Sequence, residues 1–209
     1  MMAKRVEGRS DKLLECAKAE FLEMGFQEAS LRVIAAKADT STGAIYTRFG
    51  DKEGLFHALV DKPVNELITW LESGQQDFSL KPGDEQKADV FSYKPEVWEQ
   101  LVEYLYDHWD VFRLLVRCTD IDCYKEMLNR MVDLEVSYTF KFLQMTDNDA
   151  LSAGKLTPML IHMLSNAYYS GLFEVVRHDM TKEDAFTYVR QIRRFFVQGW
   201  ADLLGIRPE

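Results

Sequence analysis

The sequence has little that would indicate a secreted or membrane-spanning protein. Its three cysteines, Cys16, Cys118 and Cys123, form no CxxC pair, which favours a reducing cytosol over a disulfide framework. No apolar run approaches the roughly 20 residues of a membrane span. The basic N-terminus is not followed by the apolar stretch of a secretory signal. We therefore expect a cytoplasmic protein with no membrane partner.

Patterns typical of enzymes are also missing. The four histidines form no HxxxH or HExxH pattern, and the chain has neither a GxSxG motif nor a P-loop. We therefore predict no catalytic residues, no metal site and no cofactor.

Negative charge is in excess but unevenly spread. The net charge is −9 from 25 Lys and Arg and 34 Asp and Glu. Residues 1–60 hold nine of each sign, so the whole excess lies in residues 61–209. Affinity for phosphates depends on the local surface, so the total charge does not exclude DNA as a partner. The asymmetry indicates two parts with different functions.

Hydrophobic spacing predicts helices and no strand, so the expected fold class is all-α. The first helix would be capped by Ser10 or Asp11 and end at Gly25. Two short helices follow, one starting after Ser30 and one over residues 42–49. A fourth covers about residues 52–73, with Pro63 bending or interrupting it.

Residues 74–94, centred on Pro82 and Gly83, are predicted to be a loop. One or two aromatic-rich helices then cover residues 96–116, and a long helix covers residues 124–145. Thr157 would cap a helix to about His178, and Thr181 would open a last helix that ends at Gly205.

The second and third short helices, joined by a tight turn, match a helix-turn-helix. In the third helix Ile45 and Phe49 are four residues apart and would anchor it to the core. Thr42 and Tyr46 share a different face, beside Gly43 and Thr47. Gly43 lowers helix stability by about 1 kcal/mol relative to Ala, and close approach to a DNA backbone would explain its presence.

Residues 10–60 resemble the DNA-binding domain of tetracycline-repressor (TetR/AcrR-type) transcriptional regulators. The motifs that carry the resemblance are FLEMGF, S-L-R-x-I-A, S-x-G, I-Y-x-x-F and D-K-E-x-L-F, in this order within residues 21–56. The chain departs from the family pattern at three positions. Asp39 replaces a usual glycine, Thr42 a common lysine, and Gly54 a helix former.

The resemblance implies DNA contacts for seven residues. Thr42 and Gly43 would face base edges, whereas the contacts to phosphate or sugar would come from Ser30, Arg32, Tyr46, Thr47 and Lys52. For two of these residues a purely structural role is the alternative. Tyr46 could simply cover Phe26 or Phe49, and Lys52 could be a solvated lysine at a helix start.

Such modules bind DNA as dimers, and the family pairs its last two helices with their copies in a four-helix bundle. A homodimer is therefore expected here. The candidate interface residues are Ala167, Gly171, Val189, Ile192, Phe196 and Trp200. Burial of these side chains within a single chain is the alternative.

The family also implies a pocket for a small-molecule effector. Aromatic walls with a few polar groups suit such a site. The candidates are Tyr104, Trp109, Phe112, Tyr138, Phe142, His162, Asn166, Tyr169 and Phe173. An ordinary aromatic core is the alternative. Arg190, Arg193 and Arg194 are interpreted as a solvated helix face.

Residues 1–52 are thus expected to form the DNA-binding domain and residues 53–209 a helical ligand-binding and dimerisation domain. The leading hypothesis is a ligand-responsive repressor, not an enzyme, that binds a palindromic operator as a dimer. A helical small-molecule-binding enzyme or carrier is the alternative, and an adaptor that binds only protein is a third.

Overall fold

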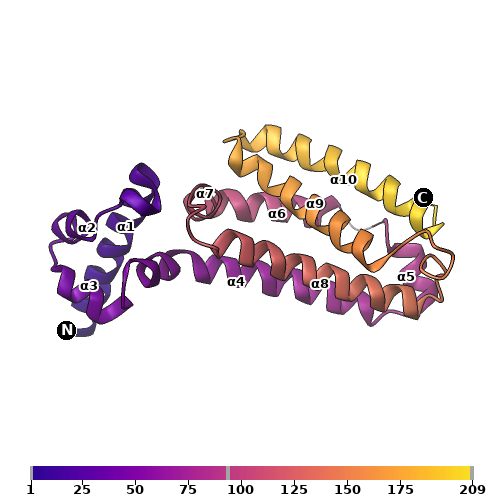
Figure 1. Cartoon of the computed structure of the whole chain (residues 1–209), viewed down its shortest axis with the longest axis horizontal. Coiled ribbons are helices and arrows are strands. Elements are labelled where there is room, and N and C mark those ends of the chain that lie inside the picture. Colours follow the sequence, from indigo (N-terminus) through magenta and orange to yellow (C-terminus); the bar gives the residue numbers. More distant parts are fainter. Residues whose placement is uncertain (1, 93–94, 208–209) are drawn as a thin grey trace. The chain divides into compact units, whose positions relative to one another are not determined.

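Over the residues that it describes, 2–92 and 95–207, the computed structural model contains ten α-helices and no strand (Figure 1). This confirms the all-α fold class. The helices are α1 (Met2–Glu28), α2 (Leu31–Lys37), α3 (Thr42–Phe49), α4 (Lys52–Ser79), α5 (Gly83–Asp89), α6 (Pro95–Asp107), α7 (Trp109–Arg117), α8 (Cys123–Met145), α9 (Pro158–Arg177) and α10 (Lys182–Leu204). None of these helices, as far as they are described, is long and apolar enough to cross a membrane.

Several helix ends lie where the sequence predicts them, because the capping residues act there. The side-chain oxygens of Ser41, Asp51, Thr157 and Thr181 each accept a hydrogen bond from a backbone N–H in the first turn of their helix. Gly205 ends α10 in the left-handed conformation, with φ 65°.

Three of the predicted boundaries are wrong. α1 begins at Met2, so neither Ser10 nor Asp11 caps it. α4 is not interrupted at Pro63 and extends to Ser79, several residues past its predicted end. The segment 74–94 is largely helical, because α4 covers its start and α5 lies in its middle. Of its predicted centre, Pro82 is the N-cap of α5 and Gly83 is the first residue of that helix.

The side chain of Gln86 explains why this segment is ordered. It is almost fully buried, and its amide nitrogen donates to the carbonyl oxygens of Ser79 and Lys81 at 3.2 and 2.8 Å. Carbonyls at the end of a helix have no partner within the helix. Gln86 in α5 therefore caps the end of α4, a contact that local sequence patterns do not reveal.

The chain divides into two compact units. Unit 1 contains the residues up to Glu66 together with His108–Tyr124, and unit 2 contains Leu67–Asp107 and the residues from Lys125 onward. α4 contributes to both units. Unit 1 is larger than the DNA-binding domain expected at residues 1–52, because α7 packs against α1.

Each unit has its own core. In unit 1 the rings of Phe21, Phe26 and Phe56 lie 5.4–5.8 Å apart between centroids. In unit 2 one buried cluster comprises Phe142, Leu143, Ala150, Leu156, Ile161 and Leu204. Cys118 and Cys123 are buried and form no disulfide within the described residues, as expected of small apolar side chains.

Candidate nucleic-acid interface and ligand cavity

The turn between α2 and α3 is formed by residues suited to it. Asp39 adopts φ 51°, a conformation that Asp tolerates better than most residues, so it can replace the usual glycine. Its carboxylate pairs with the Lys12 ammonium of α1, and this hydrogen bond lowers the pKa of Asp39. The backbone N–H of Thr40 donates to the carbonyl oxygen of Ala35 at 2.9 Å and closes the turn.

α3 has one buried face and one exposed face, as the sequence predicts. Ile45 is completely buried, whereas the Tyr46 side chain is 55% exposed. Gly43 and Thr47 are also exposed, and Thr42 is half-buried. The exposure of Tyr46 argues against the alternative that this ring simply covers the core. The hydroxyl of Thr47 donates to the carbonyl oxygen of Gly43 at 2.8 Å, so its orientation is fixed.

Nothing within the chain requires a glycine at position 43. A Cβ atom built there would meet only Ser41 Oγ, at 3.8 Å, an ordinary van der Waals contact. The backbone there is helical and not in the left-handed region. The missing side chain therefore leaves open space on the exposed face of α3, which allows the helix backbone to approach another surface closely.

At Gly54, in contrast to Gly43, contacts within the chain do require a glycine. A Cβ atom at this position would lie 1.9 Å from the backbone carbonyl oxygen of Phe49. Contact this short with backbone cannot be relieved by moving a side chain. The departure from the family pattern at Gly54 is therefore a packing requirement where the end of α3 meets the start of α4.

The N-terminus of α2 is held by a buried carboxylate of α1. Glu20 is only 4% exposed and accepts hydrogen bonds from the Ser30 backbone N–H at 3.3 Å and from Lys37 Nζ at 2.9 Å. The Ser30 hydroxyl makes no capping bond to α2. Arg32, in the first turn of α2, is exposed. The side chains of Ser30 and Arg32 can therefore contact an external anion.

Lys52 lies at the start of α4 but already has intramolecular partners. Its ammonium donates to the carbonyl oxygens of Gln27 and Ala29, each at 2.9 Å, and it lies 4.9 Å from the centroid of the Phe26 ring. An ammonium has three N–H donors, so one remains for a phosphate. The interpretation of Lys52 as a solvated lysine is wrong, because it ties α4 to the end of α1.

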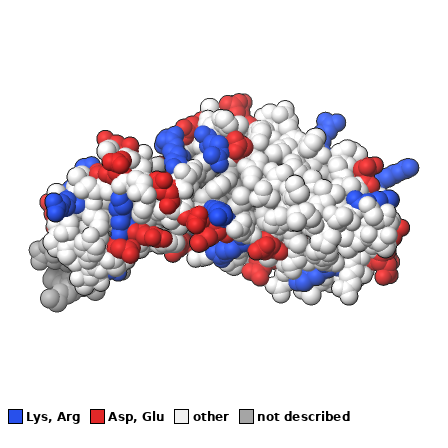
Figure 2. All heavy atoms as spheres, viewed as in Figure 1, with Lys and Arg blue, Asp and Glu red and all other residues white. Residues whose placement is uncertain are grey.

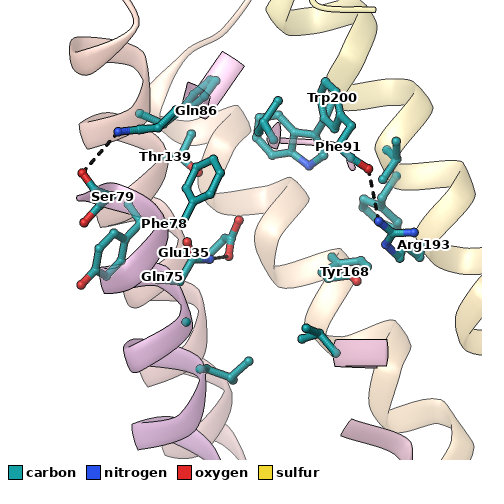
Figure 3. A pocket seen from close by; sticks show the side chains of 18 of the residues that line it. Gln75, Phe78, Ser79, Gln86, Phe91, Glu135, Thr139, Tyr168, Arg193 and Trp200 are labelled. Carbon is teal, nitrogen blue, oxygen red and sulfur yellow. Dashed lines mark hydrogen bonds between the residues drawn. The ribbon is translucent and has the colours of Figure 1, made fainter. Parts of the chain in front are cut away.

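Unit 2 contains a cavity of about 410 Å³, within the usual size range of small-molecule sites. Ten of its lining residues are aromatic: Trp70, Phe78, Phe91, Trp98, Tyr138, Phe142, Tyr168, Tyr169, Phe196 and Trp200. They come from α4, α6, α8, α9, α10 and the segment after α5. Figure 3 shows several of them around the opening between these helices.

A carboxylate lies in the wall of this cavity. Glu135 of α8 accepts hydrogen bonds at Oε2 from Gln75 Nε2 at 2.8 Å and from the Tyr169 hydroxyl at 3.0 Å (Figure 3 draws the first). Burial raises the pKa of Glu135, and these two hydrogen bonds only partly oppose the shift.

Three other polar groups around the cavity are hydrogen-bond donors. The indole N–H of Trp98 and the hydroxyl of Tyr168 are buried and have no hydrogen-bond partner within the described structure. Burial is the main cause that raises the pKa of Tyr168 well above its usual value. Arg193 of α10 lines the cavity and donates to the carbonyl oxygen of Phe91 at 3.3 Å. The sequence-based interpretation of Arg193 as part of a solvated helix face is therefore wrong.

Three of the nine predicted pocket residues, Tyr138, Phe142 and Tyr169, line the cavity. The other six do not, and the prediction is corrected for Tyr104, Trp109, Phe112, His162, Asn166 and Phe173. Two of these belong to α7 in unit 1, two are exposed on α9, one is buried in the core, and one is half-buried on α6. No sequence pattern pointed to Gln75 or Glu135, which are isolated polar residues on different helices, and Arg193 stood out only as part of an arginine cluster.

The residues predicted to form the dimer interface lie in several different environments in the structure. Val189 is buried within the chain, and Phe196 and Trp200 line the cavity. Gly171 faces α10, because a Cβ atom there would lie 2.5 Å from Ile192 Cδ1. Of these five residues only Val189 is fully buried, and the other four are half-buried by contacts within the chain. Ala167 is the exposed member of the set.

Comparison with known proteins supports the assignment of the N-terminal segment. Residues 13–59 match the family described as bacterial regulatory proteins, tetR family. The HTH-type transcriptional regulator BetI of Stenotrophomonas maltophilia is 30% identical over 82 residues, which cover 39% of this chain and 42% of BetI. The match thus spans less than half of that relative. The resemblance seen in the sequence is confirmed.

Solved structures share the fold over almost the whole chain. A protein of Syntrophomonas wolfei assigned to the TetR family of transcriptional regulators has a TM-score of 0.63 at 18% identity, covering 92% of this chain and 96% of its own. The transcriptional regulator FadR of Bacillus subtilis, solved in complex with stearoyl-CoA, has a TM-score of 0.54 at 18% identity, covering 91% and 98%. At these identities the likeness concerns the fold alone.

Proposed function

We propose that this member of the tetR family of bacterial regulatory proteins is a ligand-responsive transcriptional regulator that binds a palindromic operator as a homodimer. The observation that carries the proposal is the exposed face of α3 within the tetR-type segment. The part of this face that Thr42, Gly43, Tyr46 and Thr47 form is uncharged, rich in hydroxyl groups and open at Gly43. The regulator would act in the cytoplasm, most simply as a repressor released by its effector.

In the proposed complex α3 lies in the major groove. Thr42 and Gly43 face base edges, where close approach of the helix backbone is allowed by the open space at Gly43. The contacts to phosphate and sugar are assigned to Ser30, Arg32, Tyr46, Thr47 and Lys52. Of the three positions at which this chain departs from the family pattern, Thr42 is the one assigned to base edges, so we propose that it determines operator preference.

The homodimer would form through α9 and α10. Single chains rarely leave large apolar side chains exposed together. Met159 and Met163 on α9 and Phe195 on α10 are 67%, 60% and 75% exposed, and Ala167 is also exposed. In Figure 2 few charged side chains lie over the region where Figure 1 draws α9 and α10. An apolar, weakly charged surface suits pairing with a second copy.

The cavity of unit 2 would hold the effector. FadR, which shares the fold, is described in complex with stearoyl-CoA, so a protein of this fold can bind a small molecule. Residues of α4 from Trp70 to Ser79 line the cavity, and the same helix begins directly after α3. An effector that binds two orientations of α4 with unequal affinity would therefore change the distance between the two α3 helices of the dimer.

In vitro selection of DNA by the purified protein tests the proposal. We expect a palindromic consensus with half-sites about one helical turn apart, because a two-fold dimer reads two successive major grooves. Failure to enrich any sequence at low salt would contradict DNA binding. It would favour the carrier function that the cavity also permits.

A further inference from the structure

Glu135 is a half-buried acidic group in the cavity wall that has no counter-ion within the described residues. Its hydrogen bonds come from two neutral donors, Gln75 and Tyr169, and both end on Oε2. No ion pair involves Glu135 within the described part of the chain. An ionised carboxylate taken out of water without a positive partner destabilises the fold. Because Glu135 lies beside the cavity, its carboxylate can accept a hydrogen bond or form an ion pair with a ligand that enters the cavity.

The rest of the cavity wall suits an apolar molecule that carries positive charge. Ring faces of Trp and Tyr attract cations and favour quaternary ammonium groups in particular. Besides Glu135, the wall contributes one more acidic residue, Asp77, which is exposed on α4. Two carboxylates and ten aromatic rings therefore surround a space large enough for a drug-sized molecule.

The basic group of the cavity does not neutralise Glu135. Arg193 comes from α10 and Glu135 from α8, and Figure 3 draws Tyr168 of α9 between them. The guanidinium of Arg193 donates to the carbonyl oxygen of Phe91 instead. The donor-rich side with Arg193, Trp98 and Tyr168 can accept an uncharged polar end of the same ligand, whose cationic end would lie at Glu135.

From this arrangement we infer that the effector is a lipophilic organic cation, a quaternary or protonated amine on an apolar body, and that Glu135 is its counter-ion. The inference rests on the proposed function in so far as it assigns the effector of the same cavity. Binding of the cation to Glu135 and the aromatic rings does not itself require DNA.

Direct binding measured by titration calorimetry tests the inference with three probes that share one alkyl chain. They are decyltrimethylammonium, the neutral decanol and the anionic decanoate. We expect the cation to bind about ten-fold or more tightly than either of the other two, because only the cation pairs with Glu135 and the ring faces. Equal affinities, or tighter binding of decanoate, would overturn the inference.

Two variants separate the role of Glu135 from a general effect of charge. Glu135→Gln keeps the shape of the side chain and is expected to weaken decyltrimethylammonium binding about ten-fold while leaving decanol binding unchanged. Glu103→Gln removes an exposed carboxylate that pairs with Lys182 outside the cavity, and should leave cation binding as in the wild type. Unchanged cation binding by folded Glu135→Gln would refute the assignment.

Operator affinity measured with and without each probe separates this inference from the proposed regulation. If the cation binds through Glu135 but leaves DNA affinity unchanged, the ligand assignment holds and the regulatory coupling fails. If DNA binding is released by an anionic probe instead, regulation holds and the cationic assignment is wrong.

Discussion

Gly43→Ala is expected to make the protein more stable and a poorer DNA binder. In the free chain the new methyl group meets only Ser41 Oγ at 3.8 Å, so it introduces no clash. Replacing a helical glycine by alanine stabilises a helix by about 0.5–1 kcal/mol. For a chain of this size that gain raises the melting temperature by about 1–4 °C, measurable by thermal denaturation followed by circular dichroism.

The effect on DNA arises from the same methyl group. If α3 approaches the DNA through the open space at Gly43, the methyl group occupies that space and pushes the helix away. Loss of one base-edge contact weakens specific binding by about 1–3 kcal/mol, or roughly 5- to 150-fold. Fluorescence anisotropy with the selected operator measures this loss, and a nonspecific duplex gives the reference affinity.

Gly54→Ala provides the contrast. Its Cβ atom would lie 1.9 Å from the carbonyl oxygen of Phe49, so we expect a loss of stability of about 1–3 kcal/mol, as for overpacking in general. The reasoning would be refuted if Gly43→Ala lowered stability. It would be refuted equally if Gly43→Ala bound the operator as tightly as the wild type.

Three further predictions concern other surfaces. Lys52→Ala should lower the salt slope of DNA binding by about 1 for all sequences alike, and an unchanged slope would limit Lys52 to its contacts with α1. Phe195→Glu should yield folded monomers in sedimentation equilibrium, because the side chain is 75% exposed in the single chain; a persistent dimer would place the interface elsewhere. Because the pKa of Glu135 is raised in the folded state, the native protein retains its proton to higher pH than the unfolded chain, and the free energy of unfolding falls as pH rises between the two pKa values. Urea titrations of Glu135→Gln across this pH range should lack that part of the decline, and an unaltered profile would show that Glu135 does not titrate there.

The helix-turn-helix could be predicted because its determinants are local. Ser41 and Asp51 cap α3 and α4, Asp39 forms the turn, and Ile45 and Tyr46 differ in burial because adjacent residues lie on different sides of a helix. Each of these features depends on residues a few positions apart. The same is true of the ends of α9 and α10.

The order of residues 74–94 could not be predicted, because it depends on the burial of a polar side chain, Gln86, that no local capping pattern marks. Pro82 and Gly83 are typical of a loop, yet Pro82 is the N-cap of α5 and Gly83 is its first residue. The buried amide of Gln86 then satisfies carbonyls at the end of α4. A local pattern shows the tendency to turn but not the partner that orders the segment.

By itself the sequence determined the all-α fold, most helix ends and the family of the N-terminal segment, since capping, turn formation and apolar periodicity act over short distances. Only the tertiary structure decided which face of each later helix meets the cavity, the core or the solvent. Phe196 and Phe195 are neighbours in sequence, yet one lines the cavity and the other is exposed. The rotation of a helix about its axis is set by packing against its neighbours, and this rotation brought Glu135 next to Gln75 and Tyr169.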